Sequence, residues 1–408
     1  MKMPMRYFSM GGAFALIGVA LFYLAQKSIF SADPEVDFKY LWFAGELWNA
    51  GINPYSEAFS QEGAKVFTNT NALNSWLYPP NWWAISAFLA LFDFAEATWL
   101  WRTLNATFII VGSFLLFRAL KLARPKTPLW AGALIFFFAV TFQATPMTLA
   151  MGQTSILIFF GVCCLTYGLS LKRPAFEILG LVLLMFKPHI GIIAFFALFV
   201  LPQHRRNVLI AGTITGVLCV PALFIAGIGP TVFGFLEQLT TYSALEVNSP
   251  VNSTGLGHLV FELLSLKLPT IPLVFAGGIA AAGIVLFLHR SQKTPRGTPE
   301  FYIYVMSAII LMAITVAPLH SYDLIISVPL IVLFFIHPKN IALAFLCLGY
   351  VLLYRAGNLA KITGFYDEAV LFNIGSHLES LAGAMMLAVF IYSVSGAIFL
   401  ERLMARKP

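Results

Sequence analysis

Long apolar runs separated by shorter polar stretches dominate the chain. Several of these runs reach the roughly 20 residues that a helix needs to cross the hydrocarbon core of a bilayer. The pattern predicts an all-α integral membrane protein, a polytopic bundle of roughly 10–13 transmembrane or re-entrant helices. The apolar runs occupy residues 10–26, 76–93, 97–118, 128–147, 153–170, 174–201, 207–227, 256–266, 269–288, 300–317, 323–336, 341–354 and 378–400.

The composition agrees with this fold class and excludes a water-soluble enzyme. Of the 408 residues, 59% are hydrophobic and 11% are charged, and the mean hydropathy is +0.84. Soluble domains average about half apolar and about a quarter charged residues. The net charge of +7 comes from short basic clusters between apolar runs, a distribution typical of charges that set membrane topology. We therefore expect membrane lipid as a partner and no nucleic acid.

Basic residues near the ends of the runs predict the orientation of the chain. The first run follows Lys2 and Arg6 and has no small-x-small cleavage site, so we expect a retained first helix and a cytoplasmic amino terminus. Lys and Arg near membrane spans are retained in the cytoplasm. When every basic cluster is placed inside, the outer stretches are residues 27–75, 147–153, 228–255, 318–323 and 355–377.

Two topologies fit the first half of the chain. In the first, runs 76–93 and 97–118 together make one net crossing, and run 174–201 enters the membrane and returns. Prolines would break these runs, and broken backbone is tolerated at membrane depth where it lines a protein cavity. In the second topology, 76–93 and 174–201 are full crossings, which puts Lys121 and Lys172 outside.

Residues 289–299 are the best candidate for a linker between two modules. They would separate a front module, residues 1–288, from a C-terminal transmembrane module, residues 300–408. The front module holds the outer loop 27–75 and most of the unusual residues. We expect the two modules to form one continuous membrane domain.

The outer loop 27–75 contains the most informative segment of the sequence. Asp33 and Pro34 have the residue types of an N-cap and a first helical position, and Gly51 with Pro54 predicts the end of the same helix. Aromatic and leucine residues between these signals predict an amphipathic helix that lies on the membrane interface.

Asp37 falls in the first turn of this predicted helix, close to the outer end of the first span. Its carboxylate could complement the helix dipole. It could instead act as a general base for a hydroxyl acceptor, if burial tunes its pKa. Residue spacing alone leaves both explanations open.

Further candidates lie at the outer ends and at the breaks of the apolar runs. Tyr78 begins a Tyr-Pro-Pro sequence that an aromatic belt at the interface would also explain, and Gln153 lies at the outer end of another run. Lys187 and His189 flank a proline inside an apolar run, where an ionisable residue is a functional candidate by default. The pair would suit a phosphate at lipid level, whereas snorkelling to the surface is the alternative for Lys187.

Three outer segments add polar side chains. The turn 318–323 carries His320 and Asp323, for which acid-base or phosphate contacts and a simple connecting turn are both adequate explanations. Arg355 is a candidate cation at the outer end of its span, or a snorkelling residue. Asn252 belongs to a loop whose hydroxyl and amide groups suit sugar binding, although such turns are common.

The motifs of many soluble enzymes are missing from the sequence. It has no Walker-type phosphate loop, no His-Glu-x-x-His helix, no Gly-x-Ser-x-Gly elbow and no Cys-x-x-Cys pair. No carboxylate cluster is spaced for a metal, so we assign no metal ligand and leave a divalent-metal requirement open. We assign no cofactor with certainty.

Taken in order, these segments resemble glycosyltransferase family 87, polytopic enzymes of the GT-C superfamily. No single motif is specific, and the resemblance depends on their shared order and membrane placement over most of the chain. The motifs are Asp37, Gly-x-Asn-Pro-Tyr at 51–55, Tyr-Pro-Pro at 78–80, Gly-Gln at 152–153, Lys-Pro at 187–188, Asn-Ser-Thr-Gly at 252–255 and Pro-x-His-x-Tyr-Asp at 318–323.

The resemblance implies an inverting transfer of a sugar, most often mannose, from a polyprenyl-phosphate donor to a hydroxyl of a lipid-linked or cell-envelope glycan. It implies a GT-C helical bundle in the bacterial inner (plasma) membrane, with its active site on the periplasmic or extracellular face. Asp37 matches the catalytic carboxylate, although Asp33 and Glu35 lie nearby. The phosphate-binding candidates are Lys187, His189, His320 and Arg355, and the substrate-binding candidates are Tyr78, Gln153, Tyr322 and Asn252.

Two other classes of protein stay open. A transporter or flippase of a lipid-linked glycan commonly shows repeated halves with paired broken helices, which the sequence does not show. A non-catalytic assembly subunit would tolerate the substitution Asp37→Asn.

Overall fold

The computed structural model describes residues 5–29, 37–66, 76–244, 249–291, 295–336, 341–362 and 368–404. The regular structure of these residues is helical, which confirms the all-α class, and an isolated antiparallel bridge joins Thr254 to Leu319. The helices are α1 Met5–Ile29, α2 Phe38–Asn49, α3 Ala58–Val66, η1 Pro80–Trp82, α4 Trp83–Leu89, α5 Phe94–Ala123, α6 Leu129–Thr141, α7 Ala144–Met151, α8 Ser155–Leu171, α9 Pro174–Leu184, α10 Pro188–Phe199, η2 Pro202–His204, α11 Arg205–Ala226, α12 Ile228–Ala244, η4 Pro250–Asn252, α13 Leu256–Leu264, α14 Thr270–Arg290, α15 Pro299–Val316, η5 Ser321–Leu330, α16 Ile331–Ile336, α17 Ile341–Ile362 and α18 Glu368–Met404.

Among the described helices, six are long and apolar enough to cross a membrane. Helices α6 and α7 make a further candidate span that is bent by 52°. This number of long apolar helices indicates a multi-pass membrane protein. The six spans are Met10–Ser28, Phe94–Ala123, Pro202–Ala226, Thr270–Arg290, Pro299–Val316 and Ile374–Ser395.

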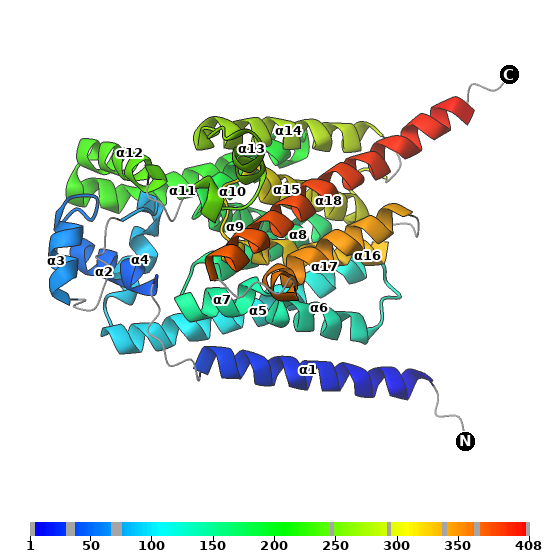
Figure 1. Ribbon diagram of the computed structural model, residues 1–408, viewed down its shortest axis with the longest axis horizontal. Coiled ribbons are helices and arrows are strands. Elements are labelled where there is room, and N and C mark those ends of the chain that lie inside the picture. Colours follow the sequence, from blue (N-terminus) through cyan, green and yellow to red (C-terminus); the bar gives the residue numbers. More distant parts are fainter. Residues whose placement is uncertain are drawn as a thin grey trace.

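Helices α2, α3, α4 and α12 gather at one end of the molecule and form what we call the cap (Figure 1). The amino end of α1 and the carboxyl end of α18 lie at the opposite end (Figure 1). Aromatic side chains hold the cap together: the rings of Trp48 and Trp76 are 5.6 Å apart, and Tyr55 lies 5.8 Å from Phe235 of α12. The site described below lies where this cap meets the membrane helices.

The helix predicted in the outer loop is α2, and it begins later than the sequence suggested. Asp37, not Asp33, occupies the N-cap position, while Asp33 lies outside the described residues. Gly51 adopts a φ of 73° just after the helix, a conformation that favours glycine. The less buried residues Lys39, Trp42, Glu46 and Asn49 share one side of α2, so the helix is amphipathic, and its placement on the membrane interface stays a prediction. Its buried residues are Phe38, Leu41, Phe43, Ala44, Gly45, Leu47 and Trp48.

Gly45 permits close contact between α2 and α4. A Cβ at this position would lie 2.0 Å from the backbone oxygen of Ser86. We expect Gly45→Ala to lower the melting temperature of the purified protein, because overpacking a core costs about 1–3 kcal/mol. Gly216→Ala is the matched control in α11, where an added Cβ meets nothing within 4 Å. Equal melting temperatures for the two variants would contradict this packing.

The helix ends decide between the two topologies. Helix α4 has seven residues, too few to cross, whereas α5 has 30, so runs 76–93 and 97–118 make one crossing. Glu177 of α9 lies 2.8 Å from the His204 ring beyond α10, so both ends of run 174–201 lie together. That run therefore turns back on itself, as the first topology requires.

Candidate active site

Asp37 contacts the connection between α7 and α8 through its main chain and its side chain. Its backbone N–H donates to the Met151 carbonyl at 2.9 Å, and Gln153 Nε2 donates to Asp37 Oδ2 at 2.7 Å. Gly152 ends α7 with a φ of 67°, and this turn presents Gln153 to the carboxylate. The Asp37 side chain makes no capping hydrogen bond to α2. The carboxylate is therefore directed at Gln153 rather than at the backbone of its own helix.

Lys187 and Asp323 form a buried ion pair, with 7% and 3% of their surfaces exposed. Ser155 Oγ lies 3.0 Å from Lys187 Nζ and donates to Asp323 Oδ1 at 2.5 Å. A buried ion pair is tolerated when good geometry and additional hydrogen bonds compensate for desolvation, and Ser155 supplies such bonds. Snorkelling of Lys187 to the surface, the alternative left open by the sequence, is therefore wrong.

The turn that carries His320 and Asp323 is a defined capping structure rather than a simple connection. The His320 backbone N–H donates to Asp323 Oδ2 at 3.2 Å, and the Asp323 N–H donates to the His320 carbonyl at 2.8 Å. His320 Nδ1 lies 3.1 Å from the Asn252 carbonyl oxygen. The Thr254 N–H also donates to the Leu319 carbonyl at 2.7 Å. The turn is thus held from both of its ends.

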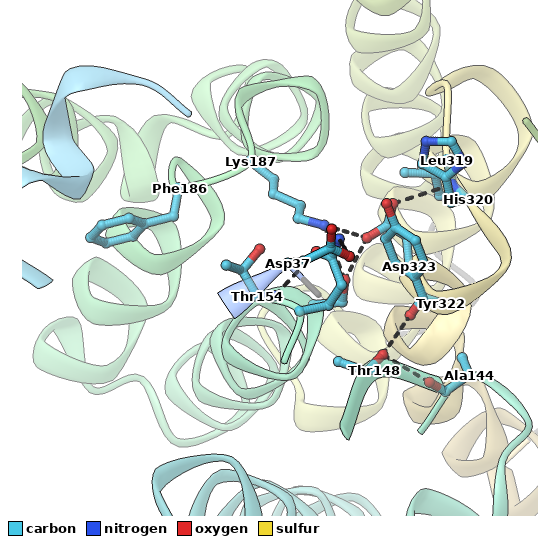
Figure 2. Close-up of polar contacts among 12 residues, drawn as sticks. Asp37, Ala144, Thr148, Thr154, Phe186, Lys187, Leu319, His320, Tyr322 and Asp323 are labelled. Carbon is cyan, nitrogen blue, oxygen red and sulfur yellow. Dashed lines mark hydrogen bonds and ion pairs between the residues drawn. The ribbon is translucent and has the colours of Figure 1, made fainter. Parts of the chain in front are cut away.

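Asp37 lies close to Lys187 and to the His320–Asp323 turn, although they come from different parts of the sequence (Figure 2). Burial raises the pKa of Asp37 above its usual value, and this effect outweighs the hydrogen bond from Gln153 and the nearby charges of Lys187 and His320. Burial also lowers the pKa of His320, against the raising effect of Asp323. The site thus combines a carboxylate suited to accept a proton with an ammonium group and an imidazole.

Tyr78 and Tyr322 also belong to this site. The Tyr78 hydroxyl lies 3.4 Å from Gln153 Oε1, so the side-chain amide of Gln153 bridges Tyr78 and Asp37. Lys187 Nζ lies 5.5 Å from the centre of the Tyr322 ring. Both tyrosines therefore lie beside the charged groups of the site.

Of the predicted phosphate ligands, His189 lies beside Lys187 and Arg355 lies in a different helix. His189 lies in the first turn of α10 beside Lys187, and its Nε2 is buried with no hydrogen-bond partner among the described residues. Arg355 lies at a kink in α17, with its guanidinium 4.8 Å from the centre of the Tyr354 ring. Within the described parts of the chain, no observed contact joins Arg355 to Asp37 or Lys187.

Sequence reasoning assigned no role to Ser155 or Glu379. Ser155 gives no signal in the sequence, because a serine after a Gly-Gln-Thr turn is an ordinary helix start. Glu379 could have been found, since it is an ionisable residue inside the apolar run 378–400. Over the residues that the structure describes, no three His, Cys, Asp or Glu side chains come together as metal ligands.

These features define a polytopic helical membrane protein with a buried polar site between its cap and its spans. The model of glycosyltransferase family 87 matches residues 76–318, which is more than half of the chain. The protein therefore belongs to glycosyltransferase family 87, a GT-C-type family, and is a membrane glycosyltransferase. Among curated proteins and solved structures, none matches the chain significantly.

The matched segment contains only part of the site. Asp37 lies before it and Asp323 lies after it. Their hydrogen bonds to Gln153, Ser155 and Lys187 join both carboxylates to the matched helices. Residues on both sides of the matched segment thus complete the site.

Proposed function

We propose that the protein transfers a sugar, which we expect to be mannose, from a polyprenyl-phosphate donor to a hydroxyl of a lipid-linked or cell-envelope glycan. The observation that carries this proposal is the partly buried Asp37 carboxylate beside the Lys187–Asp323 pair. A proton acceptor for the attacking hydroxyl and a cation near the departing phosphate would both favour such a transfer.

In the proposed reaction, Asp37 removes the proton of the acceptor hydroxyl while the oxygen of that hydroxyl attacks the anomeric carbon of the donor sugar. The new glycosidic C–O bond forms on the face opposite the donor phosphate, and the bond from the anomeric carbon to the phosphate oxygen breaks. Polyprenyl phosphate leaves with the bonding electrons, so one displacement inverts the anomeric centre. Lys187 stabilises the negative charge that develops on the departing phosphate.

The remaining candidates have supporting roles in this proposal. His320 would donate to the phosphate from Nε2 in its protonated form, since the Asn252 carbonyl already takes the single N–H of the neutral ring at Nδ1. The unpartnered Nε2 of His189 is a further hydrogen-bonding group for the same phosphate. For Arg355 only the charge of its side chain supports phosphate binding. Gln153 orients Asp37, and substrate contacts are assigned to Tyr78, Gln153, Tyr322 and Asn252.

We place the protein in the bacterial inner membrane with a cytoplasmic amino terminus. The cap would then face the periplasm or the cell exterior, since it lies opposite the amino end of α1 (Figure 1). Residues 1–288 and 300–408 would act as one membrane domain, an arrangement supported by the Lys187–Asp323 pair between them. No extra cofactor enters the proposed chemistry.

The proposed function is tested with purified protein in lipid vesicles. Labelled polyprenyl-phosphate mannose and polyprenyl-phosphate arabinose are supplied with membrane glycan extract, and labelled glycan is measured. Transfer of either sugar supports the proposal, and the comparison identifies the donor. Movement of the lipid-linked sugar across the vesicle without product would instead indicate a flippase.

The raised pKa of Asp37 predicts an unusual acid limb in the pH profile. A general base acts in its deprotonated form, so kcat/KM should fall as pH drops through a pKa above the ordinary aspartate value of 3.8. The Gln153 hydrogen bond lowers this pKa, so Gln153→Leu should move the acid limb to still higher pH. An acid limb unaffected by this substitution would assign the titration to another group.

A further inference from the structure

We infer that Glu379 of α18 is a positioning residue that holds the His320–Asp323 turn in place for sugar transfer. This inference rests on the proposed function and extends it to a helix beyond residue 318, where the family match ends. It assigns the C-terminal part of the chain a direct role in forming the site.

Glu379 makes a long-range hydrogen bond to the middle of this turn. Ser321 Oγ donates to Glu379 Oε2 at 2.6 Å, although the two residues are 58 positions apart. Ser321 stands between His320 and Asp323, whose backbone and side-chain hydrogen bonds close the capping structure. Any movement of Ser321 therefore moves the imidazole and the carboxylate that pairs with Lys187.

The next residue of α18, Ser380, contacts the segment that pairs with the residue before the turn. The Gly255 N–H donates to Ser380 Oγ at 2.9 Å, and the adjacent Thr254 pairs with Leu319. Glu379 and Ser380 thus contact both segments of this antiparallel bridge. Helix α18 consequently sets the position of His320 from two directions.

The location of Glu379 indicates that this bond is more than incidental. Its side chain is 3% exposed and lies within the candidate span Ile374–Ser395. An acidic residue inside a membrane span costs several kcal/mol and is rare there. In the described residues, its observed hydrogen-bond partner is Ser321. The Glu379 carboxylate is therefore directed at the turn and not at the membrane surface.

The test compares Glu379→Leu with Glu379→Gln in the sugar-transfer assay. Leucine removes the acceptor for Ser321, and a small misplacement of catalytic groups costs about a hundredfold in rate, so kcat/KM for the donor should fall by that order. Glutamine keeps a carbonyl acceptor and should restore most of the activity. Ser321→Ala should resemble Glu379→Leu, and the double variant should be no worse than either one.

Ser395→Ala is the control for loss of a serine hydroxyl, because Ser395 lies in α18 and bonds only to the backbone of its own helix among the described residues. This variant should keep full activity. Full activity of Glu379→Leu, or equal damage by leucine and glutamine, would overturn the positioning role. A cryo-EM structure of Glu379→Leu provides a readout that needs no turnover. A displaced His320 turn supports the inference even if the donor is not a polyprenyl-phosphate sugar, and an unmoved turn refutes it.

Discussion

Asp37→Asn is expected to reduce sugar transfer by at least about a hundredfold, since loss of a general base costs 10²–10⁴ in rate. Asparagine has nearly the same size and can still bond to Gln153, but it cannot accept the proton of the acceptor hydroxyl. The measurement is the initial rate of transfer from labelled polyprenyl-phosphate mannose, in membranes with equal amounts of each variant.

Asp93→Asn is the matched control for this experiment. Asp93 is an exposed aspartate that caps α5 by accepting from the Glu96 N–H at 2.8 Å, and asparagine caps helices equally well. This variant should keep its activity. If Asp37→Asn also retains transfer, Asp37 is not the base, and Asp33 or Glu35 becomes the next candidate. If the native chain has no transfer activity, the assembly-subunit class returns.

Lys187→Met is expected to cause the largest loss of stability. The substitution leaves the Asp323 carboxylate buried without its cation, and breaking a buried ion pair from one side costs about 3–5 kcal/mol. Asp323 is 3% exposed, so water cannot replace the missing partner. The free energy of unfolding in detergent, measured by chemical denaturation, should fall by this amount. Transfer activity should fall as well, because the ammonium group for the departing phosphate is gone.

The exposed Lys65–Glu62 pair provides the control for lysine removal. Their side chains are 69% and 45% exposed, and such pairs contribute about 0–1 kcal/mol, so Lys65→Met should change stability little. Removing both partners of the buried pair, with Lys187→Met and Asp323→Asn together, should recover stability relative to Lys187→Met but not activity. A double variant as unstable as Lys187→Met would show that the pair is not the source of the loss.

The site could be predicted as residue types but not as contacts. The order of the motifs predicted a catalytic carboxylate at Asp37 and a phosphate-binding cation at Lys187, and both assignments stay proposals. Their partners are 116 and 136 residues away along the chain, Gln153 for Asp37 and Asp323 for Lys187. Such pairings depend on which helix ends lie together, and local residue patterns carry little information about that.

The sequence by itself determined the class of the fold, because in apolar runs long enough to cross a bilayer a helix satisfies the backbone hydrogen bonds within the segment. It also determined where helices break, since proline and glycine act locally, as at Gly51 and before α10. Only the tertiary structure decided that Lys187 pairs with Asp323 rather than snorkelling and that Asp37 contacts Gln153. Burial and pairing depend on groups brought from distant helices, so they become defined when those helices pack.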